Sequence, residues 1–172
     1  MSTQLPGDNR GPAADAATEA VADAVLEEGA GPEFELARVF DFADPHDGPG
    51  FEPGHRVITD QAERDRLLGY LRGGAMVMTS TARMHDVLDP EQGEVVPMTF
   101  RTDGTWIWTE TIVYYLDRHG MAPDPRLTAH IETMCALAKG PGADLEAATR
   151  AADFLLYPPE GSQSPAVWKV GS

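Results

Sequence analysis

Histidine is the residue best suited to acid–base chemistry at neutral pH, and this chain holds five: His46, His55, His85, His119 and His130. His85 is the leading catalytic candidate. It is followed by Asp86 and lies near Arg83, and a histidine oriented by a carboxylate can act as a general base. No serine, threonine or cysteine is placed by a motif as its nucleophile, and polar residues are ordinary where a strand ends. His85 and Asp86 are therefore catalytic candidates in a sequence that favours binding over catalysis.

Recognised catalytic and cofactor-binding patterns do not occur in the sequence, which has no P-loop, GxGxxG, CxxC pair, HExxH, GxSxG or EF-hand loop. A metal site needs three or four ligands to converge, and the spacing of the histidines does not force this. His119 is explained as a positive charge at the end of a helix, and His130 as a residue on the next helix. We predict neither a metal nor a cofactor.

Two tryptophans two residues apart mark a second candidate site, in the stretch FRTDGTWIWT. If Asp103 and Gly104 form a two-residue turn, the predicted pairs are Thr102 with Thr105, Arg101 with Trp106, Phe100 with Ile107, and Thr99 with Trp108. Alternation of side chains then gives one apolar face, with Met98, Phe100 and Ile107, and one mixed face, with Thr99, Arg101, Trp106 and Trp108. The mixed face is our predicted binding surface. The competing interpretation is that helices cover the indoles and Arg101 makes a cation–π contact with Trp106.

Apolar periodicity and end signals predict the elements that position these residues. The predicted elements are a strand in 34–42, a long Pro/Gly loop at Ala43 to Gly54, a helix at 61–72, strands in 75–83, 94–102 and 105–108, and helices at 109–119, 125–138 and 143–156. Pro97 should lie at a bulge or face away from a ladder partner. The last helix is predicted to bury Leu145, Ala148, Ala152 and Leu155. Strands clustered before helices favour an α+β fold, with an antiparallel meander sheet packed by three to four helices.

Charge limits the possible partners. The net charge is −15, and residues 1–50 hold eleven acidic and two basic residues, so nucleic acid and anionic membrane surfaces are unfavourable partners and a basic protein is favourable. Residues 1–32 are predicted to be an acidic, partly disordered or weakly docked helical segment, and 33–172 a single domain in which Trp168 anchors the tail. A single cysteine and the lack of an apolar leader predict a cytoplasmic protein.

The segment VVPMTFRTDGTWIWTETIVYYLDRHGMAPDPRLTAHI, Val95 to Ile131, resembles a pattern in small, acidic, largely uncharacterised bacterial proteins similar in character to immunity proteins of polymorphic toxin systems. The resemblance implies a partner-binding α+β domain and assigns no individual functional residue.

Two functions follow as hypotheses. The first is a non-enzymatic module that binds a more basic protein, as an immunity-type or regulatory partner. The alternative is a small-molecule-binding protein or enzyme with a pocket between the Trp106/Trp108 face and the Ala43 to Gly54 loop. There Arg101 would hold a carboxylate or phosphate and His46, His55 or His85 would exchange protons.

Overall fold

The computed structural model describes residues 33–160. The predictions for residues 1–32 and for Trp168 lie outside these residues. The described part is α+β, as predicted, with helices α2 (Gln61–Gly73), α3 (Glu110–His119), α4 (Pro125–Ala136) and α5 (Leu145–Leu156) and a 3-10 turn η1 (Pro90–Gln92). Its strands are β1 (Glu35–Leu36), β2 (Phe42–Asp44), β3 (Gly48–Gly50), β4 (Ala75–Met78), β5 (Arg83–His85), β6 (Glu94–Pro97), β7 (Phe100–Thr102) and β8 (Trp106–Thr109).

The main sheet has the strand order β1-β8-β7-β4, in which β4, β7 and β8 are antiparallel neighbours and β1 runs parallel to β8. Two separate hairpins, β2-β3 and β5-β6, complete the strands of the described residues. The predicted strands at 75–83 and 94–102 each divide in two, so that one half joins the main sheet and the other joins the β5-β6 hairpin. Pro97 is the last residue of β6, where its missing N–H costs least.

The β7-β8 hairpin differs from the predicted register by two residues. Arg101 pairs with Trp108 and Thr102 with Ile107, so the loop holds four residues instead of two. The cause is Asp103, whose Oδ1 accepts the backbone N–H groups of Thr105 at 2.9 Å and Trp106 at 2.8 Å. Side chains alternate with a period of two, so this shift keeps every residue on its predicted face.

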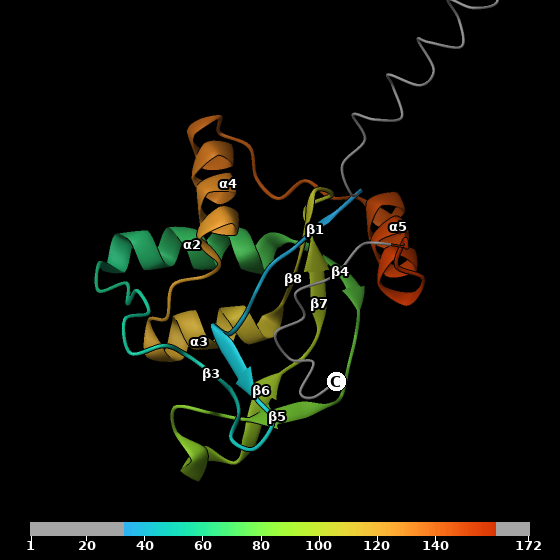
Figure 1. Ribbon diagram of the computed structural model, residues 1–172. Coiled ribbons are helices and arrows are strands. Elements are labelled where there is room, and N and C mark those ends of the chain that lie inside the picture. The colour runs from blue at the N-terminus through green and yellow to red at the C-terminus, as the bar shows by residue number, and fades with distance from the viewer. Residues whose placement is uncertain (1–32, 161–172) are drawn as a thin grey trace, which may run out of the picture. The chain divides into compact units, whose positions relative to one another are not determined.

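Helices cover both faces of the main sheet (Figure 1), with α5 on one side and α2, α3 and α4 on the other. On the α5 side, Ile107 packs with Phe34, Ala151 and Phe154. On the other side, Trp106 and Trp108 join the larger core, which includes Leu67, Leu71, Leu116, Leu127 and Ile131. The indoles therefore fill a core between the sheet and the helices.

Local sequence signals set most helix ends. Asp60 caps α2, and its Oδ1 accepts the N–H groups of Ala62 and Glu63. Gly120 ends α3 in the left-handed conformation at φ 71°, which glycine adopts at little cost. Asp124 caps α4 and is followed by Pro125, the residue favoured at the first helical position.

The predicted face of the last helix is wrong in part. Ala148 is buried and Leu155 packs against the core as predicted, but the buried face is turned away from Leu145. Leu145 is 83% exposed, whereas the buried residues of α5 are Ala147, Ala148, Ala151 and Phe154. The rings of Phe154 and Phe34 meet edge to face with centroids 5.6 Å apart. A large aromatic contact of this kind outweighs the burial of one leucine and fixes the rotation of the helix.

The predicted Pro/Gly loop contains the β2-β3 hairpin. Its turn is held by Asp44, whose Oδ1 accepts the N–H groups of His46 at 2.7 Å and Asp47 at 3.0 Å. These two hydrogen bonds lower the pKa of Asp44, and the bond from the Asp47 N–H contributes more than the bond from the His46 N–H. The Phe42 ring covers Gly50 so closely that a Cβ there would lie 2.6 Å from it. Apolar periodicity did not predict this hairpin, because its strands have only three residues each and are rich in turn residues.

Helices of the described residues are all too short or too polar to cross a bilayer.

Candidate functional site

The predicted His85–Asp86 pair does not form. His85 is exposed, and its Nε2 lies 3.6 Å from Glu94 Oε1. Asp86 is fully buried and contacts His119 instead, at 2.6 Å between Oδ2 and Nε2. The strand β5 ends at His85, and the Asp86 side chain is buried while His85 is exposed, so the two side chains do not form one site.

Asp86 is the centre of a closed hydrogen-bonded cluster. Its Oδ1 accepts the backbone N–H groups of Leu88 at 2.9 Å and Asp89 at 3.2 Å, and its Oδ2 accepts the Tyr114 hydroxyl at 2.9 Å and faces His119. Burial raises the pKa of Asp86, but the hydrogen bonds from His119, Leu88 and Tyr114 outweigh it, so the pKa lies below its ordinary value. Burial, and then the bond to Asp86, raises the pKa of Tyr114. The cluster fastens the end of β5 to α3.

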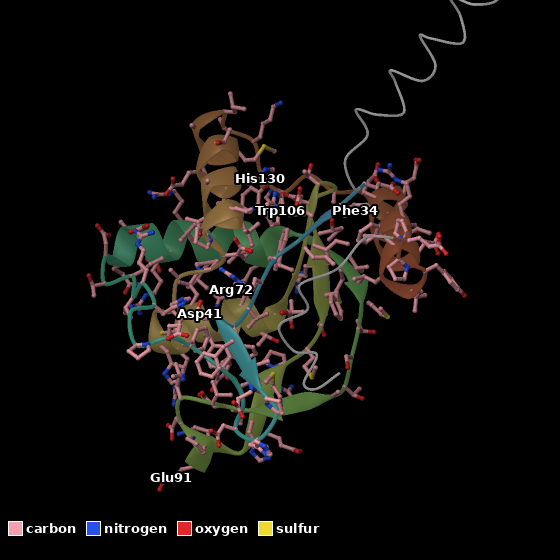
Figure 2. The ribbon with its side chains drawn as sticks, in the orientation of Figure 1. Phe34, Asp41, Arg72, Glu91, Trp106 and His130 are labelled. Carbon is pink, nitrogen blue, oxygen red and sulfur yellow. The ribbon has the colours of Figure 1, made fainter. Side chains whose placement is uncertain are left out.

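Asp103 forms a second cluster of the same design. Its Oδ1 caps Thr105 and Trp106, while its Oδ2 accepts the Tyr70 hydroxyl at 2.8 Å and lies 2.6 Å from His130 Nε2. Burial, followed by the bond to Asp103, raises the pKa of Tyr70. Figure 2 shows His130 beside Trp106 at the top of the sheet. This cluster joins the β7-β8 turn to α2 and α4.

The predicted binding residues on the tryptophan face are engaged within the protein. Trp106 is 5% exposed and Trp108 1%, so they form no open platform and line no pocket with the 43–54 segment. Arg101 binds Glu110 Oε1 through Nε at 2.9 Å and Nη2 at 2.7 Å, and its Nη1 donates to the Gly74 carbonyl at 2.8 Å. Thr99 is buried, and its hydroxyl accepts the Ser80 N–H at 3.4 Å. The cation over Trp106 is Arg126, 5.2 Å from the ring centroid, instead of Arg101.

A cavity of about 400 Å³ lies elsewhere, beside α4. One wall is the face of α4 formed by Pro125, Thr128, Ala129 and Glu132, whose spacing places them on one side of a helix. The opposite wall is made by Arg38, Asp41, His55 and Arg56, and Ala122 and Pro123 complete the lining. Asp124 links the two walls, because its Oδ1 caps Arg126 in α4 and its Oδ2 accepts the Arg38 backbone N–H at 3.0 Å.

Three ionisable groups of this pocket, Asp41, His55 and Arg56, already have partners. His55 Nδ1 lies 2.7 Å from Asp41 Oδ2, and its Nε2 lies 2.9 Å from the Ala122 carbonyl oxygen. Both neighbours accept hydrogen bonds, so both contacts are hydrogen bonds only when both ring nitrogens carry a proton. Arg56 binds Glu63 at 2.7 Å. The Arg56–Glu63 pair carries no net charge, and the contacts of His55 occupy Asp41 Oδ2 and the Ala122 carbonyl oxygen.

Three polar groups of the pocket are unpaired. Within residues 33–160, neither the Arg38 guanidinium nor the Glu132 carboxylate forms an ion pair. Thr128 is only 6% exposed, and its buried hydroxyl has no hydrogen-bond partner among these residues. A buried polar group without a partner costs about 1–3 kcal/mol, and the Thr128 hydroxyl is itself closed to solvent. The Arg38 guanidinium and the Glu132 carboxylate are therefore the groups that the pocket offers to a ligand.

Sequence reasoning missed most of this pocket because its residues come from three separate segments. Of the pocket residues, only His55 was predicted as a proton-exchanging candidate. A helix from residue 125 was predicted, but nothing local shows that the carboxylate before it, Asp124, holds Arg38, 86 residues away. Among the described residues, no group of three or more histidine, cysteine or acidic side chains is arranged to hold a metal ion.

Comparison of the chain with protein-family models, curated proteins and solved structures finds no match.

Proposed function

We propose that this protein is a non-enzymatic binding module whose partner is a more basic protein. The observation that carries the proposal is the β2-β3 hairpin, on which an exposed aromatic ring lies in a segment that is rich in carboxylates and contains no lysine or arginine. Residues 39–55 contain Asp41, Asp44, Asp47 and Glu52 but no lysine or arginine. Phe42 within this segment is 39% exposed.

Internal ion pairs leave an excess of carboxylates over cations among the described residues. Residues 33–160 contain 22 aspartates and glutamates against 11 lysines and arginines. Four of these arginines are bound to carboxylates, in the pairs Arg56–Glu63, Arg72–Asp117, Arg101–Glu110 and Arg126–Glu35. The remaining carboxylates outnumber the remaining cations, so a cationic partner gains favourable long-range attraction.

The hairpin combines the two features that a protein interface uses. An aromatic side chain supplies apolar area at the centre of a contact, and charges around it give specificity and faster association. The side chains of Asp47 and Glu52 are exposed and form no ion pair among the described residues. They are therefore available to lysine or arginine on a partner.

The test is affinity capture with the full chain as bait, from the organism that encodes it, followed by measurement of the affinity for the captured protein. We expect a partner of net positive charge whose binding weakens as salt rises. The variant Phe42→Ala/Asp47→Asn/Glu52→Gln should weaken this binding by about tenfold or more, because it removes an aromatic contact and two attractive charges.

The matched control is Glu146→Gln/Asp153→Asn, which removes the same number of charges from exposed positions on α5. It should leave affinity nearly unchanged. A partner that lacks positive charge, or one that both variants weaken equally, would refute the hairpin as the binding surface.

A further inference from the structure

The pocket beside α4 carries an inference of its own. It shares Asp41 and His55 with the 39–55 segment, but its unpaired charges, Arg38 and Glu132, lie outside that segment. We propose that it binds a short peptide of two or three residues with free termini. The peptide's C-terminal carboxylate binds Arg38, and its N-terminal ammonium group binds Glu132. A cavity of about 400 Å³ lies at the lower end of the size range of small-molecule sites, which suits a ligand of this size.

The carboxylate end is set by Arg38 and by the start of α4. The backbone of Arg38 is held at the N-terminus of α4 by its bond to the cap residue Asp124. Its guanidinium, unpaired among residues 33–160, offers the two parallel N–H donors that fit a carboxylate. The Asp124 carboxylate already caps this end of the helix, so the Arg38 guanidinium is the cation that a ligand carboxylate meets.

The ammonium end is set by Glu132, which lies seven residues beyond Pro125 on the same face of α4. Its carboxylate has no ion-pair partner in the described part of the chain, and it is the acceptor that a protonated amine needs. Thr128 lies between the two ends on the same face of α4 and forms part of the wall along which the peptide backbone runs.

The length of the α4 wall selects the length of the ligand. The wall runs from Pro125 to Glu132, and these seven residues of α-helix span about 10 Å at 1.5 Å per residue. An extended peptide covers about 3.3–3.6 Å per residue, and the side chains of Arg38 and Glu132 can shorten the gap. Two or three residues therefore bridge the charges, whereas a single amino acid is too short and a longer peptide must leave one terminus outside.

The charges of the pocket argue against a ligand of one sign. The pairs Asp41–His55 and Arg56–Glu63 occupy the other ionisable groups, which leaves one cation and one anion for the ligand. A simple anion that binds Arg38 is repelled by the Glu132 carboxylate. A simple cation that binds Glu132 is repelled by the Arg38 guanidinium. Only a ligand with both charges satisfies both groups.

The experiment is calorimetric titration of the full chain with glycine, diglycine, triglycine and pentaglycine, and with the C-terminal amide and N-acetyl forms of triglycine. We expect the affinity to peak at two or three residues, and each capped form to bind about tenfold more weakly. Arg38→Gln should weaken triglycine about tenfold and abolish the difference between triglycine and its amide. Glu132→Gln should do the same for the N-acetyl form.

The control pair is Arg66→Gln and Glu146→Gln, two exposed charges outside the pocket, which should leave the titrations unchanged. Arg38 and Glu132 are exposed, so their variants should fold, and circular dichroism checks this. No binding of any free peptide, equal binding of free and capped peptides, or equal loss in the control variants would overturn the proposal. None of these results depends on the β2-β3 hairpin, so the two proposals can fail separately.

Discussion

Three aspartate–histidine contacts in the described residues have similar distances but different surroundings. Asp86 and Asp103 each cap two backbone N–H groups with Oδ1 and bind a tyrosine and a histidine with Oδ2. Their side chains are 0% and 1% exposed. Asp41 binds His55 and the Glu52 N–H, is 21% exposed, and lines a cavity.

The difference shows that a short carboxylate–imidazole distance does not by itself identify a reactive site. In the two closed clusters every oxygen of the aspartate is occupied by donors from the protein, and the groups fasten loops to helices. At Asp41 the pair adjoins open volume and side chains without partners. We therefore expect a ligand to bind where side chains lack partners within the protein, as they do in the pocket beside Asp41.

The largest expected effect breaks a closed cluster. Asp103→Ala leaves two backbone N–H groups, the Tyr70 hydroxyl and His130 without their acceptor, inside a turn between two central strands. We expect a loss of about 3–5 kcal/mol in the free energy of unfolding, measured by urea denaturation.

Asp41→Ala is the matched comparison, because it also removes a carboxylate from a histidine. It should cost only about 1 kcal/mol, since water can replace the lost bonds at a partly exposed site. Equal losses of unfolding free energy in the two variants would contradict the claim that a closed cluster stabilises the fold more than the pair beside the pocket.

A smaller effect concerns acid stability. The pKa of Asp86 is lowered in the folded protein, so the unfolded chain takes up a proton at higher pH than the folded one. The stabilisation from Asp86 is complete above the unfolded pKa of about 4 and is lost as the pH falls through the lower folded value. Asp86→Asn should therefore flatten the decline of the urea midpoint below about pH 4.

Asp44→Asn is the exposed counterpart of Asp86→Asn in the acid-stability measurement. The pKa of Asp44 is also lowered by two backbone N–H groups, but its carboxylate is solvated, so the variant should change the acid profile less than Asp86→Asn. A profile that Asp86→Asn leaves parallel to that of the wild type would contradict the role of the cluster.

Local signals predicted the fold class and several boundaries because they act within a few residues. Asp60, Gly120 and Asp124 set helix ends through bonds to their own neighbours, and alternation around Asp103-Gly104 assigned the two faces of the hairpin. The register was missed because the Asp103 side chain widened the turn by two residues.

Distant contacts explain the other failures. His119 and His130 read as ordinary helix residues, since their aspartates lie 33 and 27 positions away. The rotation of α5 depends on Phe34, more than a hundred residues earlier in the chain. The pocket was not predictable, because its lining residues meet only when three segments, 38–41, 55–56 and 122–132, pack together.

The most direct test of the contrast between closed clusters and the open pocket is a map of amide and side-chain NMR shifts of the full chain during titration with triglycine. The account predicts saturable shifts at Arg38, Thr128 and Glu132, with the resonances of His119 and His130 unmoved. Shifts confined to the Asp86 or Asp103 cluster, with none along α4, would contradict it.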